Sequence, residues 1–305
     1  MSFELYFAGS PVPEADEWII SNKHNRLYSY LNDKSSFRRY INRGFEGKMF
    51  VDSGAFSAWT KGHSISVKQY IDWLNENSKY LHLFGQLDSI PGDRIFGASA
   101  EEVCRAGSAT WDNYLFMRKR LKTPESLLYT FHVGEPFRFL QNALDWIDDN
   151  GKKIPYIALG GMVGKPRHVR DIFLEKVFSI IKNSNNPDVQ VHAFGMTDFS
   201  LLSQYPISSA DSTSWIMVGA MGNIMTDFGV IPVSNNYKGD PQHFSHIPAS
   251  QLSPILEYIG EFGFTLEELS ETPNSRILFN AMYMQKKSDS LTNIRKKTMF
   301  RKKLF

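Results

Sequence analysis

The amino-acid sequence predicts an α/β protein, specifically a (β/α)8 TIM barrel, on three observations. Short apolar runs are each followed by a polar or glycine-rich turn and then by a helical pattern. Eight such runs occupy about 240 residues, close to the ~250 residues typical of this fold. No Pro/Gly-rich linker or long repeat divides the 305 residues. A doubly wound open sheet is the alternative, because one or two strands are easily miscounted.

The eight expected strands are the apolar runs of the chain. They cover residues 4–8, 48–51, 80–87, 127–133, 154–159, 189–194, 208–210 and 230–233. Two helices are indicated by apolar residues at helical spacing, one over 137–147 before Gly151 and one over 169–181 before Asn183. Two more are indicated by capping-box pairs, which are Ser99 with Glu102 and Thr265 with Glu268.

Composition favours a soluble globular enzyme. Apolar residues make up 42% and charged residues 22%, which excludes a disordered, collagen-like or coiled-coil chain. A single cysteine, Cys104, excludes an internal disulfide and a cysteine-rich zinc site. The first residues lack the pattern of a signal peptide, and no apolar stretch approaches the ~20 residues of a membrane span. We therefore expect a cytoplasmic protein with no membrane partner.

Charge separates the chain into two expected parts. Residues 286–305 hold eight Lys or Arg and one Asp, a net charge of +7, which leaves −5 for the rest. We expect one barrel domain over residues 1–285, ending in C-terminal helices, and a basic tail over 286–305. Such a tail either contacts nucleic acid or only solubilises the surface.

Polar residues follow several of the expected strands. In a TIM barrel the active site lies at the carboxyl ends of the strands. Three aspartates, Asp52, Asp88 and Asp211, occur at such ends, as do glycines at 160, 161 and 195. A single aspartate there often only caps the next helix. Three of them together predict a functional site.

Carboxylates without cysteine partners suit either a divalent metal or metal-free chemistry at a sugar carbon. His243 and His246 lie in one loop without an evident third and fourth ligand, so we interpret them as exposed loop histidines. The chain has no GK[ST] phosphate loop and no GxGxxG after its first strand. The sequence therefore favours a site without metal or cofactor.

Two segments in order, VDSGAF over 51–56 and ALGGMVG over 158–164, resemble the tRNA-guanine transglycosylases. In those barrel enzymes, D-S-G-G-F/Y-Q and G-G-L-x-V-G turns line a guanine pocket. LDSIPG over 87–92 looks like the segment with the base-reading aspartate. FGM over 194–196 and SSADSTSW over 208–215 look like the segments that lead to the nucleophile. The resemblance covers residues 49–215.

Departures from the family pattern refine what the resemblance implies. The tRNA enzymes carry a zinc site and a P-T-R-x-A-R stretch that this chain lacks. A zinc-less chain is similar to the phage-encoded DNA branch, which exchanges guanine in DNA for a 7-deazaguanine and so protects phage DNA from restriction; such a protein would act in the host cytoplasm. Lys165 stands near a family glutamate that accommodates a cationic base, which implies a neutral incoming base such as the cyano form.

The resemblance also implies roles for individual residues. Asp211 would be the nucleophile that forms a glycosyl ester, and Asp52 the acid and base. Asp88 would accept hydrogen bonds from the purine edge. The other expected substrate contacts come from the matched turns and strand ends: Ser53, Gly54, Phe56, His132, Gly160, Gly161 and Gly195. His132 falls where the family has a purine-reading glutamine, and a buried structural histidine is the alternative there.

Chemistry at C1′ requires a flipped or splayed guanosine, so the expected partners are guanine-containing DNA and a free deazaguanine base. Basic residues near the glycine turn and in the tail would hold phosphates. They are Lys165, Arg167, Arg170, Arg295, Lys296 and Lys297. Two alternatives remain open: the same exchange on tRNA or another RNA, and a non-catalytic barrel that binds nucleic acid.

Overall fold

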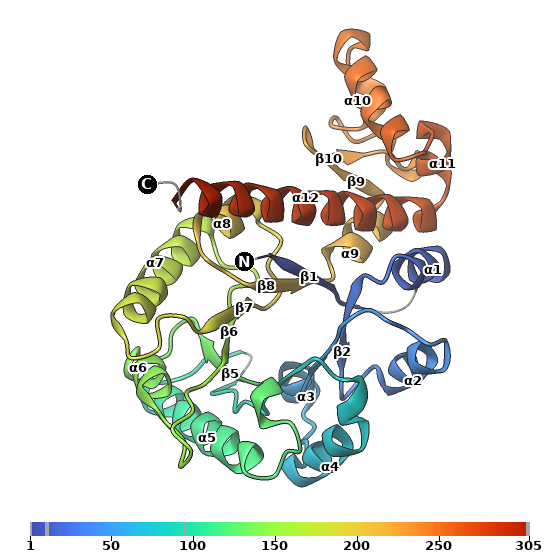
Figure 1. The fold of residues 1–305 in the computed structure, drawn as a ribbon. Coiled ribbons are helices and arrows are strands. Elements are labelled where there is room, and N and C mark those ends of the chain that lie inside the picture. The colour runs from blue at the N-terminus through green and yellow to red at the C-terminus, as the bar shows by residue number, and fades with distance from the viewer. Residues whose placement is uncertain (1, 10–11, 94, 303–305) are drawn as a thin grey trace. The chain divides into compact units, whose positions relative to one another are not determined.

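Eight parallel strands close into a barrel in chain order, which confirms the predicted (β/α)8 fold (Figure 1). The computed structural model describes residues 2–9, 12–93 and 95–302, with side chains described only as far as residue 295. The barrel strands are β1 (Glu4–Phe7), β2 (Asn25–Ser29), β3 (Met49–Asp52), β4 (Leu83–Gly85), β5 (Leu127–His132), β6 (Tyr156–Gly160), β7 (Gln190–Ala193) and β8 (Ser209–Ser212).

One of the eight barrel strands was wrongly predicted from the sequence. The strand that was not predicted is β2. Its sequence, NRLYS, is too polar to form an apolar run. Arg26 in this strand is fully buried, and its guanidinium lies over the rings of Tyr28 and Tyr40 at 5.3 and 5.4 Å. Aromatic faces stabilise a cation there, so a charged residue occupies a strand position that usually holds an apolar one.

The run over 230–233 is not in the barrel. It belongs to β10 (Gly229–Pro232), which pairs antiparallel with β9 (Asn223–Thr226) in a separate two-stranded hairpin. A short apolar run indicates a strand but not which sheet it joins, because hairpin and barrel strands share the same composition.

Helices follow the strands along the chain. They are α1 (Pro13–Ser21), α2 (Lys34–Asn42), α3 (Ala55–Lys61), α4 (Val67–Asn77), α5 (Ala100–Arg118), α6 (Arg138–Asp145), α7 (Arg167–Asn183), α8 (Phe199–Gln204), α9 (Ser214–Ala220), α10 (Ala249–Glu261), α11 (Leu266–Glu271) and α12 (Pro273–Lys302). Both predicted capping boxes are present, at the starts of α5 and α11. The helix predicted over 137–147 ends earlier, and Ile147 pairs with Lys153 in an isolated bridge.

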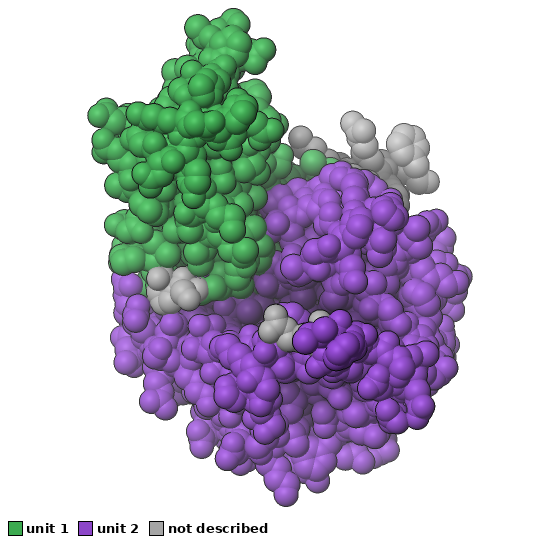
Figure 2. Space-filling view, turned by 180° about the vertical axis from the view of Figure 1, so that it is seen from behind, with its two compact units in different colours: residues 1–24, 212–305 green, residues 25–211 purple. Residues whose placement is uncertain are grey.

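The chain divides into two compact units, coloured separately in Figure 2. One comprises residues 25–211 and contains β2 to β7, most of β8, and α2 to α8. In this unit α4, α5, α6 and α7 lie outside the strands (Figure 1). Apolar and aromatic side chains fill the space between strands and helices; for example, the ring of Phe131 on β5 stacks on Phe173 of α7.

The other unit joins both ends of the sequence, residues 1–24 and 212–305. The backbone N–H of Phe3 donates to Thr292 Oγ1 at 3.0 Å, and Trp215 Nε1 donates to the carbonyl of Ala8 at 2.9 Å. Residues 286–302 of the predicted basic tail continue α12 as helix. No helix in the described part of the chain has the length and apolar character needed to cross a bilayer.

Candidate functional site

The parallel registers bring the predicted strand-end residues to one rim of the barrel. Ser29 on β2 is in register with Asp52, His132 on β5 with Gly160, and Ala193 on β7 with Ala210, which precedes Asp211. Because the strands are parallel, residues at their carboxyl ends face the same side of the barrel. The three aspartates, His132 and the two glycine turns therefore surround one site within residues 25–211.

Asp52 ends β3 and is held by the turn that follows it. Its Oδ2 accepts the backbone N–H of Gly54 at 3.0 Å. Gly54 has φ +80°, and a Cβ there would lie 2.7 Å from both Leu31 Cβ and Ser29 Oγ, so only glycine fits. Ser53 is fully buried, and its Oγ accepts the N–H of Ala55 at 3.3 Å. Ser53 and Gly54 therefore shape the turn that orients Asp52.

Asp211 is held in β8 by two donors from β7 and the residues after it. Its Oδ1 accepts the backbone N–H of Gly195 at 3.0 Å and lies 3.2 Å from His192 Nε2. The other ring nitrogen of His192 lies 2.8 Å from Ser209 Oγ, and the imidazole is fully buried. These contacts fix one carboxylate oxygen and leave Oδ2 for other chemistry. His192 was not among the site residues predicted from the sequence.

Asp88 belongs to a charged chain with His132 and Glu135. Asp88 Oδ2 lies 3.1 Å from His132 Nε2, and Glu135 Oε1 lies 2.9 Å from His132 Nδ1. A Cβ on Gly160 would lie 2.4 Å from His132 Cδ2, so the imidazole occupies the space that a side chain at position 160 would fill. Gly160 therefore seats His132, a role that the resemblance did not imply.

The acidity of Asp52 is perturbed by its surroundings. Burial, which disfavours the charged form, and then the negative charges of Asp88 and Asp211 raise the pKa of Asp52 from 3.8 to about 7. The backbone donors of Gly54 and Ser53 lower the pKa of Asp52 but do not offset these effects. A carboxyl that exchanges its proton near neutral pH is suited to general acid and base catalysis.

A pocket of about 270 Å³ lies beside Asp88. Ala55, Trp59, Leu87 and Asn113 are among its lining residues. Phe56, which was predicted to stack on a base, is 66% exposed, and its ring lies 5.9 Å from that of Trp59. Phe56 is thus at the rim and accessible to a ligand.

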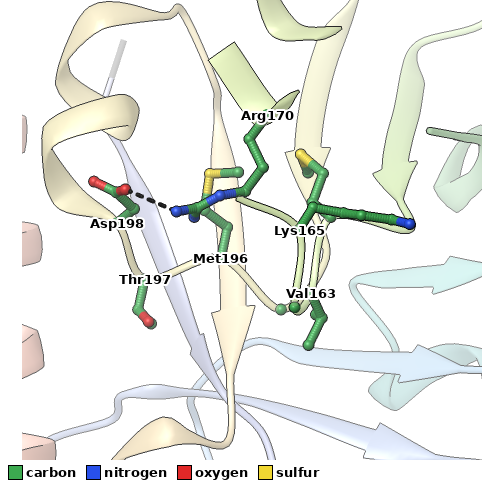
Figure 3. Close-up of a pocket in the computed structure, with 9 residues that line it drawn as sticks. Val163, Lys165, Arg170, Met196, Thr197 and Asp198 are labelled. Atoms are coloured by element: carbon green, nitrogen blue, oxygen red, sulfur yellow. Dashed lines mark hydrogen bonds and ion pairs between the residues drawn. The ribbon is translucent and has the colours of Figure 1, made fainter. Parts of the chain in front are cut away.

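A second pocket, of about 370 Å³, lies between the glycine turn after β6 and the turn after β7. Figure 3 shows Arg170 pointing toward Asp198, with Arg170 Nη2 3.2 Å from Asp198 Oδ2, while Lys165 extends away from Asp198. Arg167 Nη1 also approaches Asp198, at 3.5 Å. Asp198, which the sequence analysis missed, therefore offsets part of the positive charge of the two arginines.

Two glycines shape this second pocket. Gly161 has φ +73° and is exposed, so its backbone is accessible at the end of β6. Gly195 has φ +62°, and a Cβ there would lie 2.4 Å from Val163 Cγ2. Gly195 therefore lets the turn after β6 pass close to Asp211.

The predicted basic tail belongs to the unit formed by residues 1–24 and 212–305. The guanidinium of Arg295 lies 5.5 Å from the ring centre of Phe3, and burial lowers its pKa. The side chains of Lys296 and Lys297 lie outside the described residues. The phosphate-binding role of all three stays a prediction.

One of the two loop histidines, His243, differs from its predicted exposure. His246 is exposed as expected, but His243 is fully buried, with its Nδ1 2.8 Å from Ser245 Oγ. This correction has a local cause, since His243 caps the short helical turn over 244–246 by accepting the N–H of Ser245. Among the described residues, no group of three or more His, Cys, Asp or Glu is arranged to hold a metal ion.

Comparisons with known proteins assign no family. No protein-family model matches the chain, and no curated protein matches it.

Proposed function

We propose that this protein is a transglycosylase that exchanges guanine in DNA for a 7-deazaguanine base through a covalent aspartyl-glycosyl intermediate. The observation that carries the proposal is the pairing of two carboxyls in different states on one rim. Asp211 is fixed by Gly195 and His192, whereas Asp52 has a pKa of about 7. Environments that separate the acidities of two carboxyls are typical of a nucleophile and an acid working together.

The first displacement removes guanine. The free oxygen of Asp211 attacks C1′ of the deoxyribose, the C1′–N9 bond breaks, and the bonding electrons pass to the base. Protonated Asp52 donates its proton to the departing guanine, which leaves as a neutral molecule. A deoxyribosyl ester of Asp211 and an ionised Asp52 remain, so charge and protons balance.

The second displacement installs the new base. Ionised Asp52 takes the N9 proton of the incoming deazaguanine, N9 attacks C1′, and the ester bond to Asp211 breaks. Asp211 returns as a carboxylate and Asp52 as a protonated acid. Two inversions retain the configuration at C1′. Water must be excluded while the ester exists, because hydrolysis would leave an abasic sugar.

Support for a neutral base and a DNA partner comes from the charges at the rim. Asp88 presents a carboxylate to the donor edge of a purine-like base. Lys165 and Arg170 line the second pocket, Arg167 pairs with Asp198 of the same pocket, and Asp198 offsets only part of the charge of these three residues. A net positive pocket disfavours a cationic base and attracts phosphates. The target guanosine must leave the base stack to reach Asp211.

The test incubates the protein with DNA that carries labelled guanine, and separately with labelled tRNA, each with and without cyano-deazaguanine. Release of label from DNA that depends on the added base supports the proposal. Asp211→Asn should release no label. Asp188→Asn is its matched control and should release label like the wild type, since Asp188 is an exposed aspartate outside the rim. Release from tRNA alone would favour the RNA reaction, and no release from either substrate would refute a transglycosylase.

A further inference from the structure

The chain Asp88–His132–Glu135 has one feature that the proposed reaction does not use. His132 lies between two carboxylates, with Nε2 3.1 Å from Asp88 Oδ2 and Nδ1 2.9 Å from Glu135 Oε1. A neutral imidazole has one N–H donor and one bare nitrogen, whereas an imidazolium has two donors. With a neutral His132, one carboxylate oxygen would face a lone pair at hydrogen-bond distance. An imidazolium donates to both carboxylates at once, so this geometry fits a ring that is protonated at both nitrogens.

We propose that His132, held as an imidazolium by Glu135, is a positioning residue that keeps Asp88 ionised, so that the proton shared among the rim carboxyls resides on Asp52. The three aspartates of the rim are crowded together. Asp52, Asp88 and Asp211 lie close enough for the charges of the latter two to act on Asp52. Like charges at this range disfavour simultaneous ionisation, so one carboxyl takes up a proton more readily than the others.

The partners of each carboxyl decide which one holds that proton. Asp211 accepts from Gly195 and His192, and Asp88 accepts from a cation. Asp52 has backbone donors only, from Gly54 and Ser53. In the described part of the chain, no Lys or Arg forms an ion pair with any of these carboxyls. Asp52 is therefore the group least able to remain an anion.

Glu135 stabilises the positive charge of His132 from the side opposite Asp88. Its side chain is only 7% exposed, and its Oε2 is buried with no hydrogen-bond partner. A buried carboxylate with an unpaired oxygen is costly unless it compensates a charge, and the charge it faces is His132. Gly160 seats the imidazole, and the other ionisable groups facing this set are Tyr70, beside Asp52 and Asp88, and Tyr129, beside Glu135.

The acidity of His132 agrees with this assignment. Burial lowers the pKa of His132, but the hydrogen bonds and charges of Asp88 and Glu135 outweigh burial and raise it to about 10. At neutral pH the imidazolium is thus the prevailing form. The structural assignment is independent of the reaction, whereas its catalytic consequence rests on the proposed function.

Nuclear magnetic resonance on the full chain tests the charge assignment. With ¹⁵N-labelled histidine, both ring nitrogens of His132 are expected to be protonated at pH 8, and Glu135→Gln is expected to make the ring neutral there. With ¹³C-labelled aspartate, Asp52 is expected to titrate between pH 5 and 8 in the wild type. His132→Gln is expected to add a titrating Asp88 signal in that range, whereas His246→Gln, a change at an exposed histidine, adds none.

The pH dependence of base exchange tests the consequence. In the wild type, kcat/KM falls above about pH 7 as Asp52 loses its proton. His132→Gln is expected to shift the pH at which kcat/KM falls. It is also expected to lower the rate of exchange at pH 7 by about tenfold or more, because Asp88 then competes with Asp52 for the proton. A neutral His132 in the wild type, or an unchanged carboxyl titration in His132→Gln, overturns the inference. Absence of exchange on any nucleic acid would refute the proposed function and leave the titration result standing.

Discussion

Replacing Asp52 by Asn should make the protein more stable at alkaline pH, and the size of the effect follows from the acidity of this carboxyl. The folded protein raises the pKa of Asp52 from 3.8 to about 7. Between these two values the folded state holds a proton that the unfolded state releases, so stability decreases as pH rises. The associated stabilisation is complete below about pH 4 and is lost above about pH 7.

The magnitude is about 1.4 kcal/mol for each pH unit between the two pKa values. The interval from pH 5 to the pKa of Asp52 in the folded state is about two pH units. The free energy of unfolding of the wild type should therefore fall by at most about 2.7 kcal/mol between pH 5 and pH 8. Asn carries no titratable proton and keeps an oxygen for the N–H of Gly54. Asp52→Asn should therefore lack this loss and exceed the wild type in stability at pH 8.

Urea unfolding at several pH values measures the difference directly. The free energy of unfolding of the wild type should fall relative to that of Asp52→Asn by about 2.7 kcal/mol between pH 5 and pH 8. Asp188→Asn makes the same chemical change at an exposed position and should differ from the wild type by less than about 0.5 kcal/mol. Parallel pH curves for the wild type and Asp52→Asn would show that the acidity of Asp52 is not raised, and would remove the acid from the proposed mechanism.

Three further predictions concern other parts of the molecule. Asp211→Asn should abolish covalent capture of DNA, measured as a denaturant-resistant complex, while circular dichroism and melting temperature stay near wild type; a trapped complex would rule out Asp211 as nucleophile. Gly160→Ala should destabilise the protein by about 1–3 kcal/mol, because its Cβ would lie 2.4 Å from His132 Cδ2, whereas Gly239→Ala, where a Cβ meets nothing within 4 Å, should be close to neutral in thermal unfolding. Replacing residues 295–297 by Gln should reduce the slope of log affinity against log salt by ~0.9 for each phosphate that these side chains neutralise, and an unchanged slope would mean that they do not bind DNA.

The rim aspartates could be predicted from sequence because their signal is local. Each one follows an apolar run, and parallel strands bring such positions together whatever the register. Partners that complete the site carry no such signal. His192 lies within a strand, where it resembles a core residue, and Glu135 lies in a turn, where it resembles a surface residue. Asp198 meets Arg170 only because the start of α7 and the start of α8 lie side by side in the fold.

Strand β2 was not predicted because it also lacks a local signal. Strand prediction relies on apolar composition, and β2 contains Arg26, whose burial depends on an aromatic ring from the next helix. That compensation depends on the fold rather than on nearby sequence, so no local pattern reveals it. The apolar run over 230–233 has the composition of a barrel strand and differs only in its pairing partner.

The joining of both chain ends in one unit has a consequence for biosynthesis. The hydrogen bond of Phe3 needs Thr292, which is 289 residues later in the chain, and that of Ala8 needs Trp215. During translation β2 follows β1 closely and can pair with it early, whereas the two contacts of the flanking residues Phe3 and Ala8 need much later parts of the chain. Contacts this distant in sequence form late and slowly. A chain that stops before residue 215 would lack both of these contacts, so early termination would leave residues 1–24 without the partners that complete their unit.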